Sequence, residues 1–168
     1  MRIVSLLPRI FLGGCVLFAI GVMLYGVFAR YVMLPVTDWL DIDPPNFFWV
    51  EEVGETTLAW LTLVGAAIAV KERSHFALNL LTHRFSAGAR AVLHVVHNLI
   101  IAAFGGLVAW LGYKLVLVNI TLTSPALEIS LGWLYVSATV GGILMALYAL
   151  QAASHPAGPE HTFADVRE

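Results

Sequence analysis

The feature that most constrains this chain is a long apolar run with acidic residues before it and basic residues after it. The run from Leu58 to Val70 contains a single polar residue, Thr62. As a helix, the stretch from Trp49 to Lys71 would be about 33 Å long, at about 1.5 Å per residue. This length matches the hydrocarbon core of a membrane, which is about 30 Å thick. We therefore predict a membrane-spanning helix with an acidic mouth and a basic mouth.

The composition indicates that the whole chain belongs in a membrane. Of its 168 residues, 60% are hydrophobic and only 12% are charged, whereas soluble domains are about half apolar and a quarter charged. The net charge of −2 gives no reason to expect a nucleic-acid partner. The single cysteine, Cys15, excludes an internal disulfide and any metal site built from several cysteines.

Hydropathy predicts an all-α integral membrane domain over residues 1–152 with four transmembrane helices. We place these at about residues 10–29, 49–70, 91–118 and 131–150. Prolines and aspartates favour a loop over residues 30–48. Segment 71–90 is too short and too charged to span, so we expect an amphipathic interfacial helix there. The polar residues 153–168 are typical of a disordered tail, and we expect this tail to be cytoplasmic because both termini are predicted to face the cytoplasm.

The distribution of Lys and Arg predicts the orientation of the helices. With four spans, both termini lie on one side of the membrane. Seven of the nine basic residues fall on that side, and only Arg30 and Lys114 fall on the other. Because cytoplasmic loops are rich in Lys and Arg, we expect the N-in/C-in arrangement.

Three glutamates at the start of the second span are the strongest candidates for a polar site. Glu51 and Glu55 share a helix face, and Glu52 is adjacent. Arg30 and Lys114 are expected at the same outer depth, so the five residues can form one cluster. Three roles remain open: a solvated helix end, a polar cluster that fixes helix orientation or a partner surface, and a proton or sodium carrier site. A carrier carboxylate is usually near the midplane, where the sequence has none.

Tryptophans and small residues indicate how the helices pack. Trp49 fits an aromatic belt at the headgroup level, whereas Trp60 lies deeper and favours a packed site with a partner for its N–H. Small residues at helical spacing allow close approach either within the bundle or to a partner subunit. They occur in three spans: Gly65-x-x-x-Ala69, Gly105-Gly106 and Ala138-x-x-x-Gly142-x-x-x-Ala146.

The histidines raise an alternative function, a haem-b-bearing membrane anchor of an oxidoreductase. Such a site needs two histidines that face each other at matched depth. The histidines near the membrane are His75, His83, His94 and His97, and the first, second and fourth predicted spans contain none. We therefore expect no cofactor and no metal. Because no nucleophile constellation, phosphate loop or redox motif occurs, we also expect that the chain is not an enzyme.

The order of residues around the second span resembles the small permease subunit of TRAP transporters (tripartite ATP-independent periplasmic transporters, DctQ type). Arg30-Tyr31 closes the first span as in that family, whereas Glu55 and the long loop before Trp49 depart from its pattern. The other residues that carry the resemblance are Glu51, Glu52, Trp60, Gly65, Ala66, Arg73 and His75.

The resemblance implies a subunit of a sodium-coupled transporter for organic anions, mostly carboxylates, in the bacterial inner membrane. Its partners would be a large M-type permease subunit, a periplasmic substrate-binding protein and membrane lipids. The outer residues would contact a partner or stabilise the bundle: Arg30, Trp49, Glu51, Glu52, Glu55, Trp60 and Lys114. The cytoplasmic interface would bind anionic lipid or the large subunit: Lys71, Arg73, His75, Arg84 and Arg90.

Overall fold

The computed structural model describes residues 2–43, 46–73 and 86–154. Over these ranges the regular elements are helices: α1 (Arg2–Phe28), a π-helix η1 (Ala29–Met33), α2 (Leu34–Leu40), α3 (Phe48–Arg73), α5 (Ala87–Asn119) and α6 (Gly132–Ser154). Four helical stretches are long and apolar enough to cross a membrane: Ile10–Leu40, Phe48–Glu72, Gly88–Asn119 and Gly132–Ser154. The predicted all-helical membrane class with four spans is confirmed.

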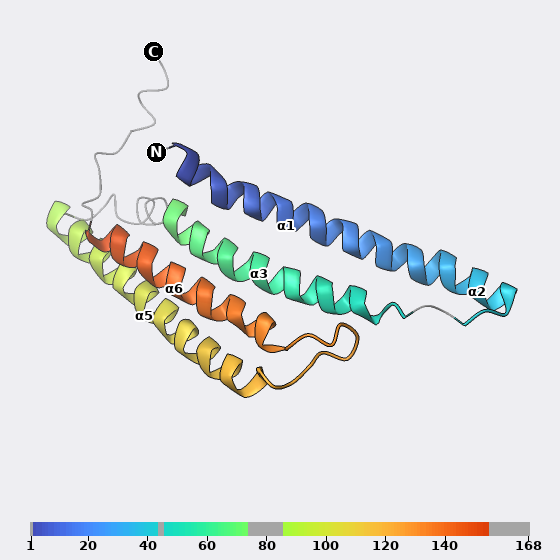
Figure 1. Cartoon of the computed structure of the whole chain (residues 1–168). Helices are drawn as coiled ribbons and strands as arrows, with labels where there is room; N and C mark the ends of the chain where they lie inside the picture. Colours follow the sequence, from blue (N-terminus) through green and yellow to red (C-terminus); the bar gives the residue numbers. More distant parts are fainter. Residues whose placement is uncertain (1, 44–45, 74–85, 155–168) are drawn as a thin grey trace, which may run out of the picture.

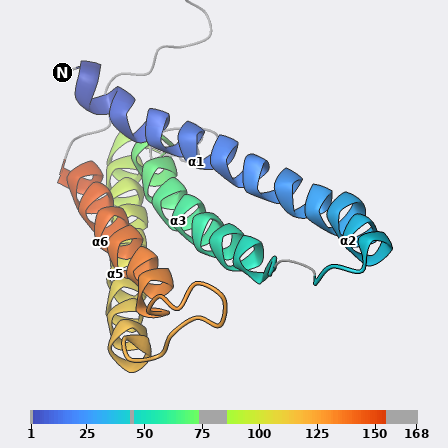
Figure 2. The same cartoon turned by 45° about the vertical axis from the view of Figure 1, so that its right-hand side comes forward.

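The helices pack in a row rather than around a common centre. α1 packs against α3, α3 against α6, and α6 against α5, so α1 and α5 are the two edges of the row (Figure 1). The beginning of α1 and the end of α6 lie at one end of the molecule, which we call the inner end. The connections from α2 to α3 and from α5 to α6 lie at the opposite, outer end (Figures 1 and 2).

Small residues bring α5 and α6 into backbone contact. A Cβ added to Gly142 would lie 2.5 Å from the backbone nitrogen of Ala109 and 2.7 Å from the carbonyl oxygen of Gly105. A Cβ added to Gly105 would lie 2.8 Å from the backbone nitrogen of Ala146, whereas one added to Gly106 would meet nothing within 4 Å. The small-residue motif of the fourth span therefore packs inside the bundle, as close helix approach requires.

The first helix is longer than predicted, because it continues without a break to Leu40. Pro35 was expected in a loop, but it lies within this continuous helical stretch, directly after the π-helical turn η1. Proline and π-helical turns are both typical of places where a helix changes its local geometry. The helix ends at Asp41, which adopts a left-handed conformation with φ 57°. The predicted loop over residues 30–48 is therefore wrong in its first part, and the connection begins at Asp41.

The predicted interfacial segment is only partly described. α3 continues through residues 71–73, and α5 begins at Ala87 after Ser86, whose hydroxyl accepts a hydrogen bond from the Ala89 amide. Between these helices, residues 74–85 lie outside the described residues, as does the predicted tail beyond residue 154.

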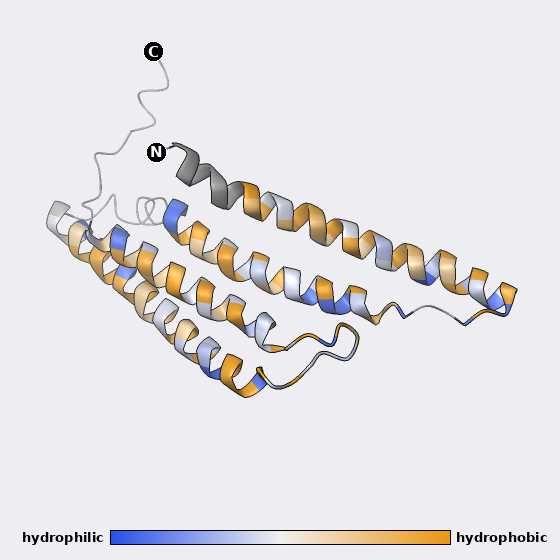
Figure 3. Ribbon diagram, viewed as in Figure 1, coloured by the Kyte–Doolittle hydropathy of each residue, from blue (hydrophilic) through white to orange (hydrophobic). Residues whose placement is uncertain are grey.

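Apolar surface dominates the outside of the molecule. Hydrophobic residues cover most of each helix, and the most hydrophilic residues gather mainly towards the helix ends (Figure 3). In the 18-residue apolar window that marks each span, at most 28% of the residues are buried by the rest of the chain. This pattern is suited to surroundings of lipid or another membrane protein rather than water.

Candidate functional site

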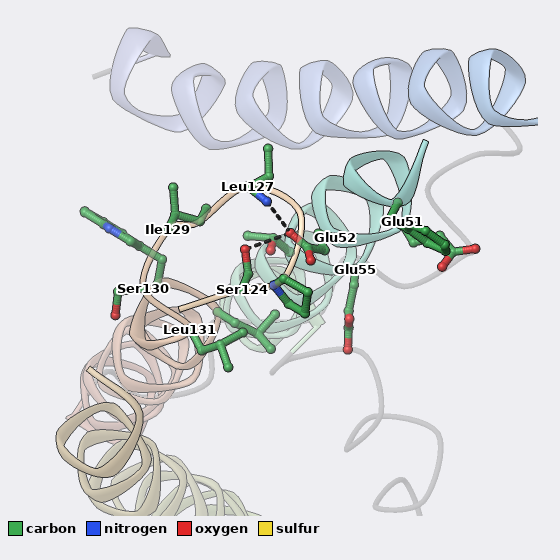
Figure 4. Close-up of a pocket in the computed structure, with 13 residues that line it drawn as sticks. Glu51, Glu52, Glu55, Ser124, Leu127, Ile129, Ser130 and Leu131 are labelled. Carbon is green, nitrogen blue, oxygen red and sulfur yellow. Dashed lines mark hydrogen bonds between the residues drawn. The ribbon is translucent and has the colours of Figure 1, made fainter. Parts of the chain in front are cut away.

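Glu52, in the first turns of α3, holds the connection between α5 and α6 through three hydrogen bonds. Its Oε2 accepts from the Ser124 hydroxyl at 2.7 Å and from the Leu127 amide at 3.0 Å. Its Oε1 accepts from the Ala126 amide at 2.8 Å. Figure 4 shows the loop curled around this carboxylate. Hydrogen bonds to a charged acceptor are among the stronger ones in proteins, so Glu52 anchors the loop to α3.

The loop held by Glu52 has an ordered internal structure. The amide of Ser124 donates to the carbonyl of Ile129 at 2.8 Å, and Thr123 and Ser130 form an antiparallel bridge. Glu128 turns the chain with a positive φ of 56°. Glu52 therefore fixes a preformed hairpin-like loop, not a flexible connection.

Arg30 and Glu51 tie the first helix to the third at the outer end. The guanidinium of Arg30, carried by the π-helical turn η1, donates to the Glu51 carboxylate in an ion pair. Both side chains are more than half exposed. The rings of Tyr25, one turn before Arg30, and Trp49, at the start of α3, form a tilted pair with their centroids 5.4 Å apart. The two contacts close the outer part of the seam between α1 and α3.

An open pocket of about 340 Å³ lies between the start of α3, the loop and the start of α6. Glu51, Glu52 and Glu55 all contribute to its lining, and Figure 4 shows the three carboxylates pointing in different directions. Apolar walls come from residues such as Phe48 and Leu131. Glu55 is exposed, and the described residues provide it with no hydrogen bond or ion pair. The three glutamates therefore differ in their surroundings.

Lys114 and Trp60, the remaining predicted outer residues, stand apart from the glutamates. The ammonium of Lys114 lies 5.2 Å from the ring centroid of Trp110, on its own helix α5, and Lys114 does not line the pocket. The reason is the order of the row, in which α6 separates α5 from α3. Trp60 is half-buried within α3, and its indole N–H has no hydrogen bond to the described residues.

At the inner end, Lys71 links α3 to α6. Its ammonium lies 5.1 Å from the ring centroid of Tyr148, a cation–π contact. Arg73 is the last residue of α3, and Arg90 lies half-buried in the first turn of α5. The other two predicted interface residues, His75 and Arg84, lie outside the described residues.

A buried polar pair in α5 was not singled out from the sequence. Asn98 is 0% exposed, and its amide nitrogen donates to the backbone oxygen of His94 at 2.9 Å and lies 3.3 Å from the His94 ring. Among the described residues, the side-chain oxygen of Asn98 has no hydrogen-bond partner. A lone asparagine within an apolar span was the signal that could have marked it. Within the described ranges, no group of three potential ligands is placed to hold a metal ion.

The helices and their contacts define the class of protein. The chain is a multi-span helical membrane protein whose polar contacts join helix ends, and its spans carry no charged residue at their centres. Residues 19–157 match the family model described as "Tripartite ATP-independent periplasmic transporters, DctQ component". The chain belongs to this family, the small permease subunits of TRAP transporters, and the resemblance found in the sequence is confirmed.

Two relatives carry the same family description in their names. The chain is 30% identical over 115 residues to the sialic acid TRAP transporter small permease protein SiaQ of Vibrio cholerae, across 68% of this chain and 65% of that protein. It is 30% identical over 110 residues to the C4-dicarboxylate TRAP transporter small permease protein DctQ of Rhodobacter capsulatus, across 64% of this chain and 48% of that protein. The matches thus span less than two thirds of either relative.

The family determines the class of activity and the location. The chain is a multi-pass protein of the bacterial inner membrane and a transporter component, so the prediction that it is not an enzyme is confirmed. Nothing in the family or the relatives supports the alternative of a haem-bearing anchor.

Proposed function

We propose that this chain is the scaffold subunit of a sodium-coupled, binding-protein-dependent transporter for organic anions. The observation that carries the proposal is the position of the charges. No Asp, Glu, Lys or Arg lies at the midpoint of a span, whereas ion and substrate paths through a membrane require polar groups at depth. The chain therefore supports transport by holding a partner, and the large permease subunit carries the substrate and sodium sites.

The proposed substrate is a carboxylate. Both relatives are named for carboxylic acids, sialic acid in one case and a C4-dicarboxylate in the other. Because substrate sites are assigned to other subunits, the chain itself does not choose between these acids.

The proposed orientation is N-in/C-in, so the outer end faces the periplasm. It rests on the seven Lys and Arg residues of the inner side against two on the outer side. Seven of the eleven carboxylates then lie at the periplasmic end: Asp38, Asp41, Asp43, Glu51, Glu52, Glu55 and Glu128. The glutamates of this end, with the loop that Glu52 anchors, are proposed as a docking surface for the periplasmic binding protein. On the cytoplasmic side, the basic residues of segment 71–90 are proposed to contact anionic lipid or the large subunit.

The test is purification of the tagged chain in mild detergent after co-expression with its genomic neighbours. A large multi-span protein is expected to co-elute in stoichiometric amount, from a fraction without a Soret band. Reconstituted with the binding protein, the complex is expected to take up a carboxylate only under a sodium gradient. Elution of the chain alone, or uptake that ignores sodium, would contradict the proposal.

A further inference from the structure

The helix α2 extends beyond the rest of the molecule and packs against none of the spanning helices. Figures 1 and 2 show it continuing in nearly the direction of α1, past the outer end of α3. Its substantial contacts are with η1, and none of its residues is buried. Trp39 lies nine residues beyond Arg30, so it is about 14 Å further out along the helix than the ion pair with Glu51.

Despite this position, α2 presents an apolar stripe. Its residues Val36, Trp39 and Leu40, together with Val32 of the preceding η1, follow the i, i+4, i+7, i+8 spacing of one helix face. Their exposed fractions are 45%, 48%, 84% and 50%. Asp38 lies on the opposite face. The helical stretch Ile10–Leu40 has 31 residues and is about 46 Å long, more than the membrane core of about 30 Å, so part of it extends past the hydrocarbon. An exposed apolar face outside that core indicates a binding surface.

The direction of α2 argues against lipid as the cover of this stripe. A helix bound in the membrane interface lies in the membrane plane, and α2 would have to turn sharply away from α1 to do so. Instead it continues the spanning helix outward. The paired rings of Tyr25 and Trp49 suit the headgroup level, and the stripe begins beyond Tyr25 along the first helix.

The charges at the tip of α2 describe the partner. Asp41 caps the helix and Asp43 follows it, so carboxylates gather at the negative end of the helix dipole, where cations are preferred. The two described cations of the outer end have other partners. Arg30 pairs with Glu51, and Lys114 lies over the ring of Trp110. A partner that covers the stripe and supplies Lys or Arg at its tip would satisfy both features.

We propose that the stripe of α2 is a contact surface for the periplasmic face of the large permease subunit, which presents an apolar surface beside Lys or Arg residues. Permanent interfaces are more apolar than reversible ones, so the stripe suits a constitutive subunit, whereas a soluble binding protein suits the acidic surface of the outer loop. The inference rests on the proposed function, since it requires a large permease subunit.

The test is photo-cross-linking in cells that express the complete transporter. A benzophenone amino acid replaces Val36 or Leu40 on the stripe, and Asp38 on the opposite face is the matched control. Adducts to the large subunit are expected from positions 36 and 40 and are expected to be several-fold weaker from position 38. Adducts to the binding protein, to lipid or to nothing from the stripe positions would overturn the inference.

A second measurement separates this inference from the proposed function. Val36→Ser with Leu40→Ser is expected to lower recovery of the large subunit at least about tenfold, as for loss of an interface hot spot. Asp38→Ser is expected to leave recovery unchanged. Because α2 has no buried residues, neither change should unfold the spanning helices. If the unaltered chain brings down no large subunit, the proposed function fails. If it does and the double variant does so equally well, only the inference fails.

Discussion

Replacing Glu52 by alanine should release the loop between α5 and α6 while leaving the helices in place. The carboxylate accepts hydrogen bonds from the Ser124 hydroxyl and from the amides of Ala126 and Leu127. Hydrogen bonds to a charged group each contribute about 1.5–3 kcal/mol. Because Glu52 is only half-buried, water can replace part of this loss. We therefore expect the loop to open more easily, by less than the sum of the individual bonds would suggest.

Hydrogen exchange measures this local effect directly. The exchange rate of a protected amide rises in proportion to the opening equilibrium, and we expect a rise of at least about tenfold for the protected amides of the loop. The measurement is mass spectrometry of peptides covering residues 120–131 from the complex in detergent or nanodiscs. Glu52→Gln should have an intermediate effect, because its amide keeps one acceptor oxygen but places an NH₂ group against donors.

Glu55→Ala is the matched control for this experiment. Glu55 lines the same pocket and carries the same charge, but it has no hydrogen bond to the described residues. Its removal should leave exchange in the loop within about twofold of the unaltered chain, since surface substitutions usually change stability by less than about 0.5 kcal/mol. Equal exchange in the Glu52→Ala and Glu55→Ala proteins would refute the anchoring role of Glu52.

Three further variants test the packing and the polar contacts. Gly105→Ala should destabilise the contact of α5 with α6 by about 1–3 kcal/mol, because its Cβ would meet backbone atoms. Gly106→Ala, whose Cβ would meet nothing, should be neutral or up to about 1 kcal/mol stabilising. Thermal denaturation in detergent compares the two variants. Arg30→Gln should cost less than about 1 kcal/mol in the same assay, because its ion pair with Glu51 is exposed. Asn98→Leu should be neutral or stabilising, because it removes a buried oxygen without a partner; a large loss of stability would indicate a partner for that oxygen.

Hydropathy and charge predicted at which end of the molecule the glutamates and Lys71 lie. The four spans, the outer position of the glutamates and the inner position of Lys71 all follow from where apolar runs end. Depth is available from sequence because the membrane imposes one axis on every helix. The position of α2 was missed because Pro35 resembles a loop signal, although proline also occurs inside long helices at places where their geometry changes, here after the π-helical turn η1.

The sequence did not show which helices lie side by side. Lys114 and the glutamates were expected to meet because they share a depth, but α6 lies between their helices. The order of the row depends on which small residues face each other, such as Gly105 against Gly142. The partners of Glu52, more than 70 residues away, were equally out of reach, since backbone amides leave no mark in a sequence.

The three glutamates show why a motif in the sequence should be tested one residue at a time. Glu51 makes an exposed ion pair, Glu52 anchors a loop, and Glu55 makes no hydrogen bond or ion pair with the described part of the chain. A combined Glu51→Gln and Glu52→Gln variant would remove a weak surface contact and a strong structural one together. Loss of uptake in that variant would mainly report the loop. Single variants separate a docking role of the charges, which predicts weaker binding-protein affinity for Glu51 and Glu55, from a folding role, which predicts faster loop exchange for Glu52 alone.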